Sequence, residues 1–327
     1  MKVLLLGATG LLGHNVLLRL VDEGHQVRVL VRCADGLRVE GDGWEAVVGN
    51  PTDRETLCRA TEGCEAIINC AGATDMSLHR KEFDAVNLHL PQMVVYVMEQ
   101  QGIKRLVHVS TVNTVGNGFP GHPSKGDEPP VPPFSENLYA ASKLAGERVV
   151  HDTAHEHPDW HVVVVNPGFM LGPYDVKPSS GRMLLAAYRK RVMLAPKGGK
   201  AFVHVGDVAQ AVVAALTRGE SGRRYVAVNS QACLTIKELY LLQAKVCGYR
   251  QQVLTIPNWV VLAAGKVGDI LRSLGMNTEM SSRNVRLLTV CEHYDSALAL
   301  RDLGMPQTPI AEAISAFHEW TNKNTTT

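Results

Sequence analysis

Short apolar runs alternate with amphipathic stretches through the first half of the chain. The apolar runs are rich in Val, Ile and Leu and are bounded by turn-forming residues, which predicts strands at 2–6, 26–31, 46–48, 66–69, 106–110 and 161–165. Between them, apolar residues recur three and four positions apart, which predicts helices at 11–23, 53–61, 90–101 and 138–152. The sequence therefore predicts an α/β fold built on a doubly wound parallel sheet, because strands that alternate with helices form βαβ units.

The alternation weakens after residue 167. Here the pattern predicts a strand at 225–228 and helices at 208–216, 236–246 and 310–320, with Asp207 as the cap of the first. Six prolines within 117–136 predict an irregular loop, and its place between two candidate catalytic segments favours a substrate-facing role over a passive surface excursion. The apolar stretch 256–274 is compatible with a pocket lining, an interface or contact with a membrane surface.

Composition narrows the class of protein. Of 327 residues, 45% are hydrophobic and 20% charged, and 33 basic against 32 acidic residues leave a net charge of +1. This balance is typical of a globular protein and gives no field for gripping nucleic acid, so we expect a small-molecule partner. The seven cysteines form no C-x-x-C pair, which predicts buried thiols in the cytoplasm and no metal site. No apolar stretch reaches the ~20 residues of a membrane span.

A glycine-rich turn joins the first strand to the first helix. It has the spacing G-x-x-G-x-x-G, and its residues expected to contact a dinucleotide are Gly7, Thr9, Gly10, Leu11, Leu12 and Gly13. Glycines permit a tight turn and close approach of the backbone to a pyrophosphate, and the helix N-terminus presents N–H groups to it. The turn therefore predicts a Rossmann-type cofactor site.

Later strand ends predict further cofactor contacts. Arg32 follows the second strand, nineteen residues after Gly13, where a fold that prefers NAD carries an acidic residue. A guanidinium there favours the 2′-phosphate of NADP(H), although Asp35 in the next loop keeps NAD(H) as an alternative and Arg32 alone is compatible with a solvated strand end. Asn50 is expected to bond the adenine. The small residues expected to let the cofactor lie close are Ala71, Gly72 and Ala73.

Tyr139 and Lys143 lie four residues apart on a predicted helix and so share one face. A fixed ammonium beside a phenol favours the phenolate, whose free pKa is near ~10. A lone Y-x-x-x-K is also explained by a surface tyrosine beside a lysine. Here, however, Ser110 and Thr111 place two hydroxyls at the carboxyl end of a preceding strand, where open α/β sheets bind ligands.

The glycine turn, the hydroxyls at 110–111, Y-x-x-x-K and the segment 166–173 (Asn-Pro-Gly-Phe-Met-Leu-Gly-Pro) occur in the order found in one enzyme family. The chain resembles the extended short-chain dehydrogenase/reductases, the epimerase/dehydratase-like branch, and is most similar to dihydroflavonol-4-reductase-like and 3β-hydroxysteroid-dehydrogenase-like members. The resemblance is good to about residue 215. Val115 stands where many relatives carry an aromatic residue.

The resemblance implies roles for individual residues. Tyr139 would exchange a proton with the substrate oxygen, and Thr111, with Ser110 as runner-up, would hydrogen-bond that oxygen. Lys143 would tune Tyr139 and hold the nicotinamide ribose, and Pro167 would border the nicotinamide. Asn87 would support the site from behind.

The family also implies two interleaved domains and a homodimer. A cofactor domain would comprise residues 1–168 and about 202–232, and a smaller, mostly helical substrate domain would comprise about 169–201 and 233–322. A frayed tail would occupy 323–327, and helices 90–101 and 138–152 would pair two copies.

Three functions follow as hypotheses. The leading one is an NADP(H)-dependent oxidoreductase that interconverts a ketone or aldehyde and a secondary alcohol on a small, moderately apolar substrate. The second is a nucleotide-sugar epimerase or dehydratase with bound NAD, whose diphosphate would be clamped by a basic run at Arg182, Arg189, Lys190, Arg191, Lys197 and Lys200. The third is a non-catalytic protein that senses NADP(H), against which the three catalytic side chains argue.

Overall fold

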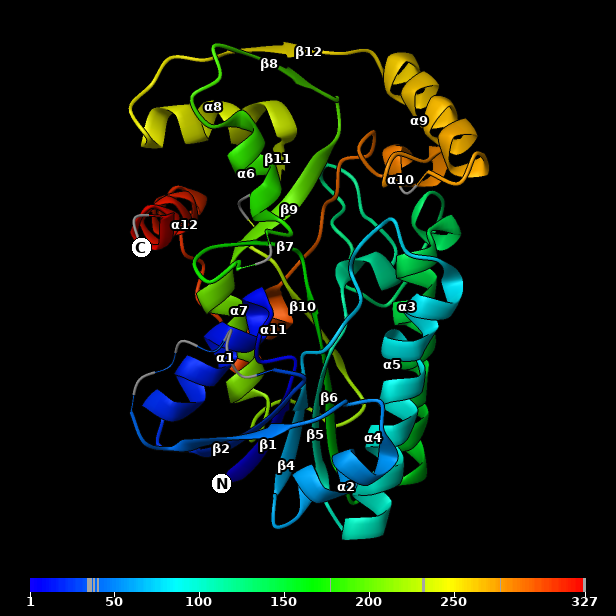
Figure 1. Cartoon of the computed structure of the whole chain (residues 1–327), viewed down its shortest axis with the longest axis vertical. Helices are drawn as coiled ribbons and strands as arrows, with labels where there is room; N and C mark the ends of the chain where they lie inside the picture. The colour runs from blue at the N-terminus through cyan, green and yellow to red at the C-terminus, as the bar shows by residue number, and fades with distance from the viewer. Residues whose placement is uncertain are drawn as a thin grey trace.

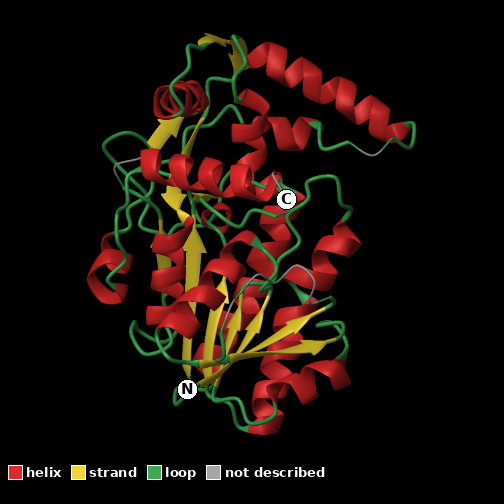
Figure 2. Ribbon diagram, turned by 60° about the vertical axis from the view of Figure 1, so that its left-hand side comes forward, coloured by secondary structure: helices red, strands yellow, loops and turns green. Residues whose placement is uncertain are grey.

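The computed structural model describes residues 1–33, 37, 39, 41–176, 178–230, 233–276 and 278–325. Its largest element is a seven-stranded sheet with the order β10-β6-β5-β4-β1-β2-β3. The strands are β1 (Lys2–Leu6), β2 (Gln26–Val31), β3 (Trp44–Val48), β4 (Ala66–Asn69), β5 (Arg105–Val109), β6 (His161–Pro167) and β10 (Arg224–Ala227). Every neighbouring pair is parallel. All carboxyl ends therefore meet at one edge, and the predicted α/β fold is confirmed (Figure 2).

Helices cover both faces of this sheet (Figure 1). Alternate residues of each strand face opposite sides, so that Val3 and Leu5 enter one core while Leu4 and Leu6 enter the other. The first core holds α1 (Leu11–Asp22), α7 (Val205–Ala214) and α11 (Ala297–Leu303). The second holds α2 (Arg54–Thr61), α4 (His89–Gln101) and α5 (Leu138–Glu156), and α3 (Arg80–Asn87) packs on α5.

The remaining elements form a smaller part beyond the carboxyl edge (Figure 1). A three-stranded sheet has the order β11 (Cys233–Thr235), β9 (Gly199–His204), β7 (Phe169–Leu171). It shares an apolar cluster with α6 (Gly181–Ala187), α8 (Ile236–Val246) and α12 (Ile310–Thr325). Farther out lie the parallel pair β8 (Val192–Ala195) and β12 (Gln252–Thr255), then α9 (Asn258–Ser273) and α10 (Ser282–Arg286).

Some segments differ from the prediction. α7 begins at Val205, not near 208, because the His204 ring caps it by accepting from the Gly206 N–H at 3.0 Å. The predicted cap, Asp207, instead accepts from the N–H and hydroxyl of Thr308 at 2.8 and 2.7 Å, so that prediction was wrong. α11 packs into the main core through Ala299 and Leu303, although the sequence placed this segment with the substrate domain.

Two other expectations concern the chain's surface and its end. α12 continues to Thr325, past the point at which a frayed tail was expected to begin. Cys64 is buried, but Cys33 is exposed and the other cysteines are half-buried, so the expectation of buried thiols holds for one of the seven. Among the described residues, no helix has the length and apolarity needed to cross a membrane.

Candidate active site at the carboxyl edge of the sheet

The glycine turn after β1 is packed so tightly that side chains are excluded at two positions. Gly7 has φ +84°, and a Cβ there would lie 2.7 Å from the Ala71 nitrogen, at the end of β4. A Cβ on Gly13 would lie 2.1 Å from the Gly7 carbonyl oxygen. Because both obstacles are backbone atoms, only glycine fits either position. The turn therefore holds α1 against the ends of β1 and β4.

The N-terminus of α1 is open for a ligand. Its N-cap, Gly10, offers no side-chain cap, whereas Leu11 and Leu12 are buried and fix the first turn. Thr9 and Gly10 are exposed. Uncapped N–H groups at a helix N-terminus bind phosphate oxygens well, because the helix dipole favours negative charge there. The residues present thus fit the pyrophosphate of a dinucleotide.

The residues expected to contact the adenosine half stand at the same edge of the sheet. Arg32 is exposed directly after β2, and Asn50 is exposed after β3. The Asn50 side-chain oxygen accepts from the N–H and hydroxyl of Thr52 at 3.1 and 2.9 Å, which stabilises its own turn. The alternative acid, Asp35, lies outside the described residues. The cofactor roles of Arg32 and Asn50 stay predictions.

Asn87 ties the segment after β4 to the helix that carries Tyr139. Its amide nitrogen donates to the Ala73 carbonyl at 3.0 Å and to the Ser142 hydroxyl at 2.9 Å, and its oxygen accepts from the Ala73 N–H at 2.9 Å. A Cβ on Gly72 would lie 3.8 Å from Lys143 Nζ. The segment from Ala71 to Ala73 therefore lies directly beside α5, the helix that carries Tyr139 and Lys143, and Asn87 joins the two.

Thr111, Tyr139 and Lys143 come together at the end of β5. The Asn137 side chain caps α5 by accepting from the Ala140 N–H at 3.1 Å, which sets the first turn that carries Tyr139. A hydrogen bond joins the side chains of Tyr139 and Thr111. Lys143 is 3% exposed, and its Nζ donates to the Val109 carbonyl at 2.7 Å. One helix face and one strand end thus supply all three groups.

The electrostatics of these groups differ in one respect from the expectation. Burial raises the pKa of Tyr139, and the hydrogen bond with Thr111 lowers it in part. The sequence assigned that lowering to Lys143, whose ammonium is instead directed at the carbonyl oxygen of Val109. Burial also lowers the pKa of Lys143 to about 8, against a smaller opposing effect of Glu147. The lysine is thus close to losing its proton near neutrality.

Glu147, which the sequence analysis missed, is fully buried behind the site. Its Oε2 accepts from the Thr114 hydroxyl at 2.7 Å, from the Asn166 amide at 3.0 Å and from the Ser110 hydroxyl. Its Oε1 accepts from Arg224 of β10. Glu147 lies four residues beyond Lys143 and so continues the helix face of Tyr139 and Lys143, the signal by which it could have been found.

The hydrogen bonds and the ion pair of Glu147 link the strands β6 and β10 and the end of β5 to α5. Burial raises the pKa of Glu147, but the nearby His151 ring, the Arg224 charge and the hydrogen bonds from Ser110 and Thr114 outweigh it and bring the pKa to about 2. The carboxylate is therefore charged at neutral pH. Ser110, the runner-up for the catalytic hydroxyl, is engaged by Glu147 and not by Tyr139, which leaves Thr111 as the hydroxyl at Tyr139.

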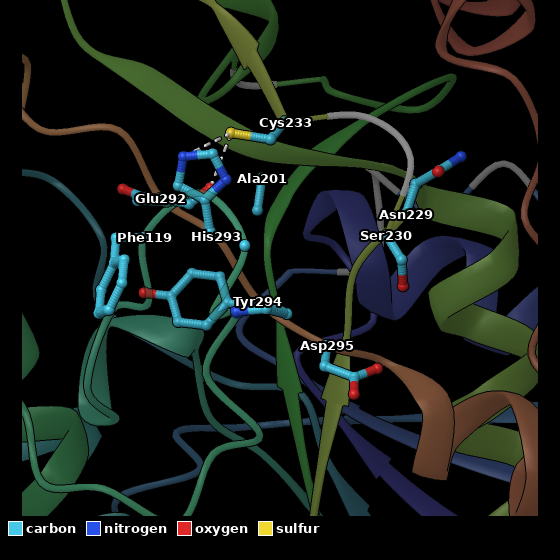
Figure 3. A pocket seen from close by; sticks show the side chains of 11 residues that line it. Phe119, Ala201, Asn229, Ser230, Cys233, Glu292, His293, Tyr294 and Asp295 are labelled. Atoms are coloured by element: carbon cyan, nitrogen blue, oxygen red, sulfur yellow. Dashed lines mark hydrogen bonds between the residues drawn. The ribbon is translucent and has the colours of Figure 1, made fainter.

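A pocket of about 230 Å³ lies between the proline-rich loop and the segment 292–295 (Figure 3). The loop is joined to this segment by the Gly118 and Ser124 N–H groups, which donate to the His293 carbonyl at 3.1 and 3.0 Å. Cys233 Sγ lies 3.7 Å from His293 Nε2, yet burial raises the pKa of this thiol to about 11. Burial therefore keeps Cys233 protonated near neutral pH.

The basic run does not form one clamp. Lys200 is buried, paired with Glu292, and donates to the Leu287 carbonyl at 3.1 Å. Arg182 pairs with Glu279 at 2.8 Å. The segment 189–191 is exposed beside β8, in the smaller part of the molecule. The cations thus belong to separate places.

Comparisons with known proteins agree with this architecture. The model of the NAD dependent epimerase/dehydratase family matches residues 3–229. A putative dihydroflavonol 4-reductase of Synechocystis is 27% identical, over 96% of this chain and 92% of its own length. Sterol demethylase protein B of Methylococcus capsulatus is 29% identical, over 98% and 99%. The fold also resembles that of UDP-glucose 4-epimerase from Thermus thermophilus in complex with NAD, with a TM-score of 0.77 at 21% identity over 98% of both chains.

Proposed function

Because the chain belongs to the NAD-dependent epimerase/dehydratase family, we propose that it is an NADP(H)-dependent oxidoreductase that interconverts a carbonyl and a secondary alcohol on a small, moderately apolar substrate. The match to the family model confirms the resemblance seen in the sequence. Members of this family are NAD(P)-dependent enzymes that act on CH–OH groups, and this chain is one of them. The observation that carries the proposal is the meeting of Thr111, Tyr139 and Lys143 at the carboxyl edge of the sheet.

In the reducing direction a bound nicotinamide supplies the hydride to the carbonyl carbon. Tyr139 gives its phenolic proton to the carbonyl oxygen, and Thr111 donates a hydrogen bond to the same oxygen. Lys143, charged below its pKa of about 8, would hold the nicotinamide ribose, whereas the group that hydrogen-bonds the phenol in this structure is Thr111. In the oxidising direction Tyr139 takes the alcohol proton. The raised pKa of Tyr139 suits it to the role of proton donor.

The preference for NADP(H) rests on Arg32. The exposed Arg32 guanidinium directly after β2 would pair with the 2′-phosphate of a bound NADP(H), and the uncapped start of α1 would hold its pyrophosphate. The Arg32 side chain thus suits the 2′-phosphate of the cofactor, and the N–H groups at the start of α1 suit its pyrophosphate. Fluorescence titration tests this: NADPH should bind more tightly than NADH, and Arg32→Ser should remove the difference, whereas Arg148→Ser, at an exposed position on α5, should keep it.

The preference for an apolar substrate rests on two observations. Two similar proteins are named as a putative dihydroflavonol 4-reductase and a sterol demethylase protein. The cations that a nucleotide sugar would need are dispersed, since Lys200 and Arg182 are each paired with a carboxylate. The epimerase alternative therefore loses its support from the basic run.

Turnover tests the chemistry. With NADPH and a panel holding a dihydroflavonol and a 3-oxosteroid, Tyr139→Phe should lower kcat by at least about a hundredfold and leave NADPH affinity unchanged, because only the proton donor is removed. Tyr96→Phe, which removes the hydroxyl of a half-buried tyrosine on α4, should behave like the wild type. Full activity of Tyr139→Phe refutes the mechanism. Cofactor binding without turnover of any carbonyl would favour the sensing protein, and NAD released only on denaturation would favour the epimerase.

A further inference from the structure

The end of the molecule farthest from the large sheet carries a surface that is both apolar and cationic. It consists of the outer face of the β8/β12 pair and the exposed stripe of α9, which lie at the same end of the molecule in both views (Figures 1 and 2). Only Ile256 and Pro257 separate β12 from α9. We call it the distal surface, and its large exposed apolar residues are Val192, Leu194, Leu254, Trp259, Leu262, Val267, Ile270 and Leu274.

α9 packs with its small residues inward and its large ones outward. A Cβ on Gly268 would lie 1.6 Å from the Met280 carbonyl oxygen, and one on Gly265 would lie 2.4 Å from the Val285 side chain. The helix therefore approaches its neighbours through glycines. Trp259 is 71% exposed and Ile270 59%, although such residues usually form the buried side of a helix. An outward apolar stripe along four turns is typical of a surface that has a partner.

The β8/β12 pair continues this surface. The two strands are parallel and in register, with Leu194 opposite Leu254, and both side chains are exposed. The alternate residues Ala195 and Val253 face inward and are buried with α8. Because side chains alternate along a strand, the outer face carries leucines where a solvated sheet carries polar residues.

Exposed cations outnumber acids around these apolar residues, and the acid of α9, Asp269, accepts from the Ser282 N–H at 3.0 Å. Arg189, Lys190 and Arg191 lead into β8, Arg250 leads into β12, and all four are exposed. Lys266 is exposed within the α9 stripe. Neither 183–206 nor 247–268, the segments that build most of this surface, contains Asp or Glu. The charge of the distal surface is therefore positive, although the net charge of the whole chain is only +1.

We propose that the distal surface docks on an anionic phospholipid bilayer. Its leucines, Ile270 and Trp259 would enter the boundary between headgroups and acyl chains, and the cations would contact lipid phosphates. A second copy of the chain fits this surface less well, since a twofold axis through it would bring like cations together. The sequence left three roles open for the apolar stretch 256–274: a pocket lining, an interface or contact with a membrane surface. The proposal selects contact with a membrane surface.

The C-terminal end of α9 and the helix α10 contact a segment that leads to the candidate active site. Arg272 of α9 donates to the Ser77 carbonyl at 3.0 Å, and Asn284 of α10 donates to the Met76 carbonyl at 3.0 Å. The segment that holds these carbonyls follows Ala73, which Asn87 ties to the catalytic helix. Asn284 also accepts from Asn137, the cap of that helix, at 3.2 Å. The distal surface is thus connected through α9 and α10 to the cap of the helix that carries Tyr139.

Vesicle sedimentation tests the proposal without any need for a substrate. The full chain should sediment with phosphatidylcholine vesicles that contain about one-third phosphatidylglycerol and much less with pure phosphatidylcholine. Lys190→Gln/Arg191→Gln should lower the partition coefficient roughly five-fold per cation, and Trp259→Ser/Ile270→Ser should lower it at least as far. Val48→Thr, at an exposed valine of β3, and Lys104→Gln, at an exposed lysine outside the surface, should bind like the wild type.

Two outcomes overturn the proposal. One is equal sedimentation of the wild type and the Trp259→Ser/Ile270→Ser variant. The other is a wild-type dimer in light scattering that Trp259→Ser/Ile270→Ser converts to a monomer without any vesicle binding, which would assign the surface to a second copy. Thermal unfolding of each variant shows whether it has folded. Vesicle sedimentation does not depend on turnover. A negative sedimentation result would therefore refute membrane docking without bearing on the proposed oxidoreductase activity, and a negative activity assay would not bear on membrane docking.

Discussion

Replacing Glu147 by glutamine should destabilise the protein in a pH-dependent way. The change keeps the size of the side chain but removes the charge that accepts from Ser110, Thr114, Asn166 and Arg224. The pKa of Glu147 is about 2 in the folded protein, and its ordinary value is 4.5. A difference of about 2.5 units corresponds to roughly 3 kcal/mol of stability at pH 7. Glu147→Gln should lower the free energy of unfolding by about that amount.

The sign of the pH dependence follows from the direction of the shift. Since the pKa is lower in the folded state, the stabilisation is complete above about pH 4.5 and disappears as the pH falls towards 2. The gap between wild type and Glu147→Gln should therefore shrink by up to ~1.4 kcal/mol per pH unit below pH 4.5. Below that pH the wild type loses the stabilisation provided by the charged Glu147 carboxylate, which the variant lacks at every pH.

Urea unfolding of both proteins, at neutral pH and at two values below 4.5, measures this gap. Glu156→Gln provides the control, because Glu156 is exposed on the same helix and should change stability little at any pH. A gap under about 1 kcal/mol at pH 7, or one that stays constant into the acid range, would falsify the reasoning, since a buried, hydrogen-bonded carboxylate cannot be removed at no cost.

Two further predictions concern the cofactor edge. Gly13→Ala forces a Cβ against the Gly7 carbonyl and should cost roughly 1–3 kcal/mol in urea unfolding, whereas Gly10→Ala, whose Cβ would lie 3.4 Å from that oxygen, should fold like the wild type and lose NADPH affinity. Wild-type stability of Gly13→Ala would contradict the packing described. Because the pKa of Lys143 is about 8, its proton is lost as the pH rises through that value, and kcat/KM should fall about tenfold per unit above it; a flat profile to higher pH would refute a role for the ammonium.

The sequence predicted the cofactor half of the fold well, because its elements are long and follow local patterns. The glycine turn was found by its spacing and position, and Tyr139 and Lys143 by their spacing together with the hydroxyls at 110–111 and the family resemblance; the structure brings them to one edge of the sheet. β7, β8, β11 and β12 are only three or four residues long and are defined by pairing with distant segments, which no local pattern shows. α9 was missed as a helix because its apolar residues face outward and its glycines inward.

The buried polar groups mark the second limit of sequence reasoning. In the sequence, Glu147 is an ordinary glutamate of a predicted helix, and Asn166 is part of the segment shared with the family. Only the fold shows that the Asn166 amide on β6 donates to the Glu147 carboxylate on α5. Lys200 likewise stood in a basic run and lies instead in a buried pair with Glu292. Burial depends on which distant segments pack together, so the sequence alone does not show whether a charged residue is buried or exposed.

The return of the chain to the main core at α11 has a consequence for folding. Ala299, Leu303 and Met305, close to the end of the chain, pack with residues of β1, α1 and α7. A segment far along the sequence therefore completes the core that the first strand and the first helix begin. A variant truncated after residue 229 would expose the apolar surface that these three residues cover, so we expect this core to form fully only when both segments are present.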